Sequence, residues 1–412
     1  MLSTFEGLKK NFKLKPQQYI IDNWVFRLHY KATVYIFIIS SILVTSRQYI
    51  GEHIRCIADG GVPEHVMNTF CFFTTTFTVP YVNATKENLE KLLETKEMSA
   101  HMLDTGNLAH PGVGPYGIDS NEPIVRHAYY QWVPFVLFFQ GLMFLIPHLL
   151  WKKMEGRRLR YLVDSLKYAA FSLQEKEVKV GDNKIPSKSD REKKIQQVRQ
   201  LFQDGVYVNK NWALKLMLVE VLNFIHVIIQ IAITNRFLGY KFLKLGSTVW
   251  RNGLDSSVDI LDEVFPKITK CTFHKYGPSG SIQYHDAMCV MALNIINDKI
   301  YTAVWFWFIF LFICSILGLL WRIITYILHA RSRGFNRMIF SSSCPGKLNP
   351  WRVLNVTRTP SYSDWLFLVY LSKNVDPLVF KEIFVGIAQD YEERSSMKKP
   401  LLDLEDSDLK YA

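Results

Sequence analysis

Four long apolar stretches separate segments rich in polar and charged residues along this chain of 412 residues. A helix needs about 20 apolar residues to cross the hydrocarbon core of a bilayer, which is about 30 Å thick. The pattern therefore predicts four membrane-spanning helices. They cover residues 30–48, 132–151, 214–234 and 300–321, and Arg322 ends the last of them. The second contains Pro134 and Pro147, which are expected to bend it.

The segments between the predicted spans differ in charge. Residues 1–29 carry five Lys and Arg against two acidic residues, and residues 152–213 carry fifteen against eight. Residues 49–131 reverse the balance, with five against ten. Cytosolic loops carry the excess of Lys and Arg, and four spans put both ends of the chain on one side. The predicted cytosolic segments are therefore 1–29, 152–213 and 322–412, and the predicted extracellular loops are 49–131 and 235–299.

Composition agrees with a membrane protein. The chain is 49% hydrophobic and 14% aromatic, with a mean hydropathy of +0.04, which is too apolar for soluble domains of this total length. Its net charge of +12 is compatible with nucleic-acid binding, but the basic residues alternate with apolar runs, as in a chain oriented by its charge in a membrane. The predicted class is an all-α membrane protein with a helical cytoplasmic domain, and no nucleic-acid partner is expected.

Six cysteines are divided between the two sides of the membrane. They are Cys56 and Cys71 in the first extracellular loop, Cys271 and Cys289 in the second, Cys314 in the fourth span and Cys344 in the last cytosolic segment. Disulfides persist outside the cell and thiols stay reduced in the cytosol, so we expect two disulfides and two free thiols. Four cysteines allow three pairings, and spacing alone does not choose among them. A metal site on Cys271 and His274 lacks a second pair of ligands, so no metal or other cofactor is expected.

The first extracellular loop also holds a glycosylation motif. Asn83-Ala84-Thr85 fits the acceptor pattern for N-linked glycans. The motif is usable only outside the cell, so Asn83 is a glycosylation candidate.

The third span has one polar face. At 100° per residue its polar side chains fall within an arc of about 120°. They are Glu220, Asn223, His226 and Gln230. Polar groups inside a membrane are costly unless they pair or meet water, so this face is predicted either to form hydrogen bonds between helices or to face an aqueous pathway. Under the second interpretation, Glu220 is the residue expected to influence gating.

Five residues mark the start of the second span: Tyr129, Tyr130, Gln131, Trp132 and Val133. Tyrosine and tryptophan are enriched where helices cross the headgroup region, so an aromatic belt with packing between subunits is the simple interpretation, and a direct role in gating is the alternative. With the next two residues they read YYQWVPF, which resembles the signature of the innexins, the invertebrate gap-junction proteins. Further segments resemble that family, namely NTFCFFTTTFTV from residue 68, CVMALNIINDKIYTAVWFWF from residue 289 and DWLFLVYLSKNVDPLVFKE from residue 364.

The resemblance covers nearly the whole chain and has several implications. It implies an octameric ring, of this chain or with other innexins, that docks head to head with a ring in the neighbouring cell. It also implies the disulfides Cys56–Cys289 and Cys71–Cys271, and a pore-lining position for residues 1–29. The composition of that segment would equally allow an interfacial helix that lies on the inner leaflet. The chain departs from the family pattern at Phe72, where a tryptophan is usual, and in its long first loop.

The resulting expectation is a structural subunit of gap-junction channels and hemichannels in the plasma membrane, which passes ions and small metabolites between adjacent cells. Its partners would be other subunits, the opposing hemichannel and membrane lipids. No catalytic residues are expected, because no nucleophile and base are paired in the sequence. Two alternatives remain: an undocked release channel in a single membrane, and a four-span adhesion or barrier protein similar to claudins.

Overall fold

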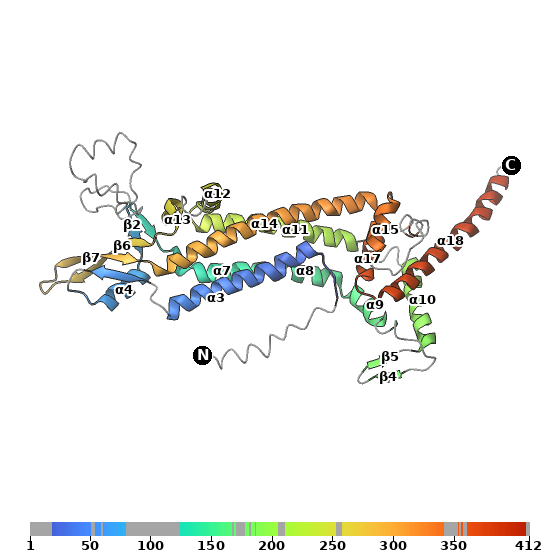
Figure 1. Ribbon diagram of the computed structural model, residues 1–412, viewed down its shortest axis with the longest axis horizontal. Coiled ribbons are helices and arrows are strands. Elements are labelled where there is room, and N and C mark those ends of the chain that lie inside the picture. The colour runs from blue at the N-terminus through green and yellow to red at the C-terminus, as the bar shows by residue number, and fades with distance from the viewer. Residues whose placement is uncertain are drawn as a thin grey trace. The chain divides into compact units, whose positions relative to one another are not determined.

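The computed structural model has four helices long and apolar enough to cross a membrane (Figure 1). These candidate spans are Trp24–Gln48, Val133–Glu155, Trp212–Phe237 and Ala292–Leu328. The predicted class, with four spans, disulfide-braced outer loops and a helical cytoplasmic domain, is confirmed. The structure describes residues 19–50, 54–58, 61–79, 124–166, 169, 178–180, 183–185, 187–204, 211–252, 258–341, 353, 356 and 361–408.

Two of the spans are interrupted helices. The first consists of α2 (Trp24–Arg27), the π-helical turn η1 (Leu28–Thr33) and α3 (Val34–Ile50). The second is divided into α7 (Val133–Met143) and α8 (Ile146–Glu155). Pro147 explains this break, because it has no N–H for the carbonyl four residues earlier. The third and fourth spans are the continuous helices α11 (Trp212–Phe237) and α14 (Ala292–Leu328).

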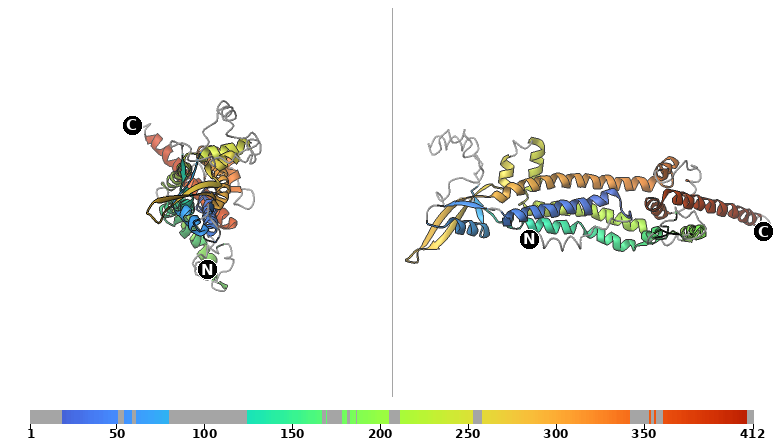
Figure 2. Two further views of the ribbon diagram at one scale, coloured as in Figure 1. Left: turned by 90° about the vertical axis from the view of Figure 1, so that its left-hand side faces the viewer. Right: turned by 60° about the horizontal axis from the view of Figure 1, so that its bottom comes forward.

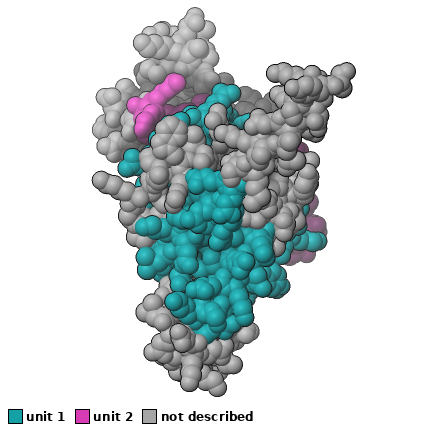
Figure 3. All heavy atoms as spheres, turned by 90° about the vertical axis from the view of Figure 1, so that its right-hand side faces the viewer, with its two compact units in different colours: residues 1–27, 147–223, 315–412 teal, residues 28–146, 224–314 magenta. Residues whose placement is uncertain are grey.

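The chain forms two compact units, which Figure 3 marks by colour, and α11 and α14 contribute to both. Unit 1 comprises residues 1–27, 147–223 and 315–412, and unit 2 comprises residues 28–146 and 224–314.

Unit 2 contains a five-stranded antiparallel sheet in the order β1-β7-β6-β2-β3, which the sequence patterns did not predict. Its strands are β1 (Arg55–Ala58), β2 (Thr76–Thr78), β3 (Val125–His127), β6 (Ile268–Tyr276) and β7 (Ile282–Val290). Both predicted extracellular loops contribute strands to it. Helix α4 (Glu64–Phe73) lies against β1 and β6. The β6–β7 hairpin extends away from α3 and α7 (Figures 1 and 2).

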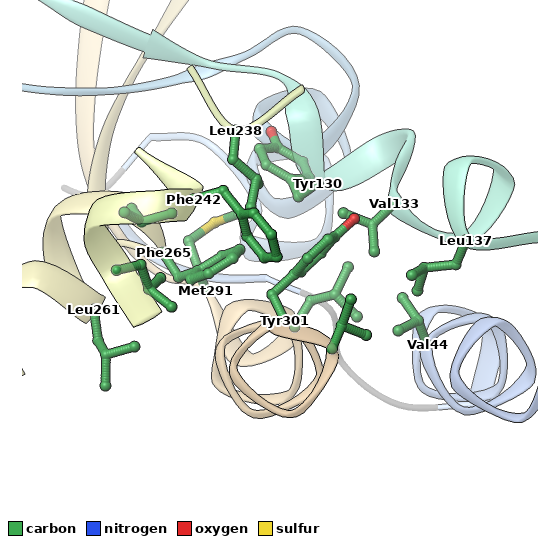
Figure 4. Packing of buried hydrophobic residues seen from close by; sticks show 14 of the residues in the cluster. Val44, Tyr130, Val133, Leu137, Leu238, Phe242, Leu261, Phe265, Met291 and Tyr301 are labelled. Carbon is green, nitrogen blue, oxygen red and sulfur yellow. The ribbon is translucent and has the colours of Figure 1, made fainter. Parts of the chain in front are cut away.

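An aromatic core connects this sheet to the outer ends of the spans in unit 2. The ring of Tyr301 on α14 stacks on Phe265, with 5.5 Å between centroids, and Met291 and Phe242 surround it (Figure 4). Phe242 begins α12 (Phe242–Asn252), which is followed by α13 (Val258–Val264). On α12, a Cβ at Gly246 would lie only 1.9 Å from the ring of Trp305. The close approach of α12 to α14 therefore requires glycine.

Unit 1 contains the helix α17 (Tyr362–Ser372), whose eleven residues are all buried. This helix packs against α9 (Arg158–Leu166), α15 (Arg333–Ser341) and α18 (Pro377–Asp408). The unit also contains α10 (Lys188–Asp204) and the hairpin of β4 (Val178–Val180) and β5 (Asn183–Ile185). Ser361 and Asp364 form a capping box at the start of α17. Arg199 on α10 pairs with Asp390 on α18 through an Nε–Oδ2 hydrogen bond of 3.0 Å. Because α17 is buried on all sides, its sequence is an apolar run, although this helix is not one of the candidate spans.

Candidate functional site

Two disulfides connect the two extracellular loops within unit 2. Cys56 on β1 is bonded to Cys289 on β7, at positions directly opposite each other in the ladder. Cys71 on α4 is bonded to Cys271 on β6. This is the pairing that the family resemblance implies. Each bond joins segments at least 200 residues apart, so the outer end of the first two spans is covalently tied to that of the last two. Cys314 is a buried free thiol.

The signature residues fasten the second span to the first extracellular loop. Tyr129, Tyr130 and Gln131 form a 3₁₀ turn before α7. The hydroxyl of buried Tyr130 donates to the carbonyl of Cys71 at 3.3 Å, and Gln131 Nε2 donates to the carbonyl of Phe72 at 2.6 Å. Burial also raises the pKa of Tyr130. These bonds hold the end of α4 beside the Cys71–Cys271 disulfide.

The remaining signature positions divide between surface and core. Trp132 is exposed and Val133 is fully buried. An exposed tryptophan at the end of a span fits the aromatic-belt interpretation. The belt interpretation did not anticipate the bonds of Tyr130 and Gln131. A polar Gln inside an aromatic motif was the available signal for them.

His127 lies buried on β3 in the same sheet. Its Nε2 is 2.7 Å from Oγ1 of Thr78 on β2. Burial lowers the pKa of His127 to about 4, and the positive charge of Lys241 acts in the same direction. The imidazole is therefore neutral in the folded sheet at neutral pH.

We expect the outer sheet to lose stability as the pH falls from 6.5 to 4. The pKa of His127 is lower in the folded protein than in the unfolded chain, so the unfolded chain binds more protons in this window. The free energy of unfolding should fall by up to about 1.4 kcal/mol per pH unit there, and not above pH 6.5. Hydrogen exchange of the β2 and β3 amides against pH measures this. His127→Gln should remove this pH dependence of exchange, whereas the control His65→Gln, at an exposed position, should keep it. If His127→Gln and wild type have the same exchange rates at every pH, His127 is not the group responsible.

The outer half of the polar face on α11 is packed within unit 2. Gln230 is fully buried, with its Nε2 3.1 Å from Nε2 of His226 and 3.5 Å from the sulfur of Met143. The ring of His226 packs edge to face on Phe144 at 4.7 Å. The bond between Gln230 and Met143 joins α11 to α7, which fits the interpretation that the face forms hydrogen bonds between helices, whereas the bond between Gln230 and His226 lies within α11.

The inner half of that face belongs to unit 1 and centres on a buried ion pair. Arg322 Nε on α14 donates to Glu220 Oε2 at 2.8 Å, and the two side chains are 9% and 7% exposed. Asn23 Nδ2 donates to Glu220 Oε1 at 2.7 Å. Asn223, one turn further along α11, is also buried. Glu220 therefore joins the third span, the fourth span and the residues that precede the first.

The segment before the first span is anchored in unit 1, which no sequence pattern predicted. The amide of Asn374 accepts from the N–H of Ile20 at 2.5 Å and donates to the carbonyl of the same residue at 2.8 Å. Trp151 Nε1 donates to the carbonyl of Ile21 at 3.0 Å. Buried Asp22 pairs with Arg27 at 2.8 Å. The side chains of Asn374 and Trp151 thus hold the backbone of Ile20 and Ile21 just before the first span begins.

Three predicted features fall outside the described residues. They are the glycosylation candidate Asn83, the free thiol of Cys344 and most of the proposed pore-lining segment, residues 1–18.

Comparisons with known proteins give one result. The family model described as Innexin matches residues 22–391. The chain is 44% identical to Innexin inx7 of Drosophila melanogaster over 95% of this chain and 85% of that protein. It is 39% identical to Innexin inx2 of Schistocerca americana over 95% and 99%, and 40% identical to Innexin inx2 of Drosophila melanogaster over 94% and 96%. With its four spans and disulfide-tied outer loops, the chain belongs to the innexin family and is a membrane-embedded subunit of gap-junction channels.

Proposed function

We propose that eight copies of this chain form a ring around a pore, and that two rings in adjacent cells dock end to end through their outer sheets. The pore passes ions and small metabolites. Other innexins can take places in the same ring. Support for the ring comes from the family resemblance and from apolar side chains exposed on the spans, which lipids or neighbouring subunits must cover. Single-particle averages of the purified assembly should have eightfold symmetry.

The tip of the β6–β7 hairpin is the observation that supports docking. Tyr276, Ile282 and Tyr284 are 78%, 53% and 66% exposed there. Exposed apolar and aromatic side chains gathered at one place are typical of a protein interface. Cys271 and Cys289 lie on the two strands of the same hairpin, so the disulfides fix the direction in which the tip points.

Paired cells that express only this chain provide the test. Wild type should give junctional conductance between the cells and dye uptake by single cells. Tyr276→Asp with Ile282→Asp should abolish conductance and keep dye uptake, because buried unpaired charges oppose docking but not ring assembly. The matched variant Tyr276→Phe with Ile282→Val should behave as wild type.

The other outcomes separate the alternatives. Uptake without conductance in wild type would indicate an undocked release channel. Neither activity, with cells adhering, would indicate an adhesion protein. Unchanged conductance in the Asp variant would show that docking uses another part of the outer sheet.

A further inference from the structure

A basic pocket lies where the second span ends. It has a volume of about 380 Å³ and is lined by Leu149, Lys152, Lys153, Gly156 and Arg157. Helix α8 stops at this point, because Gly156 and Arg157 both have positive φ, at 69° and 61°. The left-handed turn ends α8 and starts α9 directly after it. It leaves three exposed cationic side chains around one shallow hollow that is open to solvent.

No acidic side chain in the described part of the chain neutralises the cations of this pocket. Among the described residues, no acidic side chain is within ion-pair distance of Lys152, Lys153 or Arg157. The nearby carboxylate of Glu155 is buried and already engaged, since it accepts from the N–H of Arg157 at 2.8 Å and of Leu159 at 2.9 Å. It therefore caps α9, and the three cations keep an excess of positive charge.

The pocket also has an apolar side. Leu149 is 60% exposed and lies one turn before the two lysines on α8, hence on the same face. Ile146 and Leu150 are exposed on the same helix. The lysines are the first charged side chains after the apolar run of the second span. An apolar surface followed by cations is the order in which a helix leaving the membrane meets acyl chains and then headgroups.

We propose that this pocket binds the phosphate-bearing headgroup of an anionic phospholipid in the inner leaflet. Lys152, Lys153 and Arg157 neutralise the phosphate groups, and Leu149 contacts the start of the acyl chains. Clusters of Lys and Arg next to the cytosolic end of a span attract anionic lipids through the surface potential of that leaflet. A soluble phosphate compound could supply the same charge but would leave Leu149 without a partner.

Fluorescence anisotropy of a labelled short-chain phosphatidylinositol 4,5-bisphosphate, added to the purified full chain in detergent, tests the proposal. Lys152→Gln, Lys153→Gln and Arg157→Gln combined should weaken binding by at least about tenfold. The control Lys188→Gln, Lys193→Gln and Lys194→Gln removes the same charge from α10 and should stay within about twofold of wild type. The charge-conserving set Lys152→Arg, Lys153→Arg and Arg157→Lys should also bind.

Two results would overturn the proposal. The first is equal affinity of wild type and the Gln variant. The second is competition by free inositol 1,4,5-trisphosphate as strong as that of the unlabelled lipid, which would identify a soluble anion as the ligand. If the triple Gln variant elutes as aggregate on size exclusion, Lys153→Gln alone replaces it, with a weaker but measurable loss of binding expected.

Discussion

Electrical coupling should fall to background when Cys56 is replaced by serine. The Cys56–Cys289 bond ties the four-residue strand β1 to β7 at the edge of the outer sheet. Removing a native disulfide typically costs about 2–5 kcal/mol, and β1 is then held mainly by its short ladder with β7 and by the bond from the Cys56 N–H to Asn68 Oδ1. The loss should therefore release β1 and the start of the first extracellular loop. Junctional conductance in paired cells measures the effect, and surface biotinylation separates failed docking from failed delivery.

Two further variants make this result specific. Cys56→Ser with Cys289→Ser should lose coupling as completely as the single change, which excludes mispairing by the thiol left behind. Cys314→Ala alters a buried free thiol in the fourth span and should keep coupling near the wild-type level. Wild-type conductance in the double serine variant would mean that the sheet does not need the bond.

Removing one partner of the Glu220–Arg322 pair should lower the free energy of unfolding by about 3–5 kcal/mol. Both side chains are almost fully buried and joined by two hydrogen bonds. A single change, Glu220→Gln or Arg322→Met, leaves the other residue without its partner inside the protein. Thermal melting of the detergent-solubilised chain measures the loss, and the amount of protein at the cell surface should fall with it.

The double variant decides whether the two residues act together. Glu220→Gln with Arg322→Met should be less damaging than the sum of the single changes, because no buried charge remains unpaired. Asp164→Asn, which breaks the exposed pair with Arg160, is the matched control and should cost under about 1 kcal/mol. Strict additivity at Glu220 and Arg322 would contradict coupling. The hypothesis that Glu220 influences gating has a separate test, which is the conductance of Glu220→Gln channels that reach the surface. The carboxylate of Glu220 also accepts a hydrogen bond from Asn23, so the change alters a contact with the segment before the first span.

The spans were predictable because a membrane-spanning helix is determined by the composition of its own segment of the chain. Apolar runs of sufficient length identify a membrane helix without knowledge of its neighbours, and Pro147 marked the break between α7 and α8. The outer sheet was missed, although the residues of β6 and β7 are rich in strand formers and flank the turn sequence GPSGS. Two such segments on either side of a turn are the usual signal of a hairpin, but the other three strands of the sheet have only three or four residues each and are too short to give an alternating pattern.

The contacts inside the site were less predictable because they join distant parts of the chain. The polar face of α11 marks Glu220 as unusual, but in the sequence Arg322 is simply the first charged residue after an apolar run. The bonds between Asn374 and Ile20 cross 354 positions, and nothing in the local sequence of either residue indicates the other. Partners of this kind depend on tertiary packing and leave no periodic pattern.

The order of the disulfides along the chain also has a consequence for biosynthesis. Cys56 enters the lumen of the secretory pathway early, but its partner is 233 residues later, just before the last span. During that interval the nearest available thiol in the sequence is Cys71, whose own partner, Cys271, is 200 residues later in the chain. A bond between the two early cysteines would block both native pairs. Correct oxidation of this subunit therefore requires either that its first loop stay reduced until translation is nearly complete or that an early Cys56–Cys71 bond be opened again by thiol–disulfide exchange.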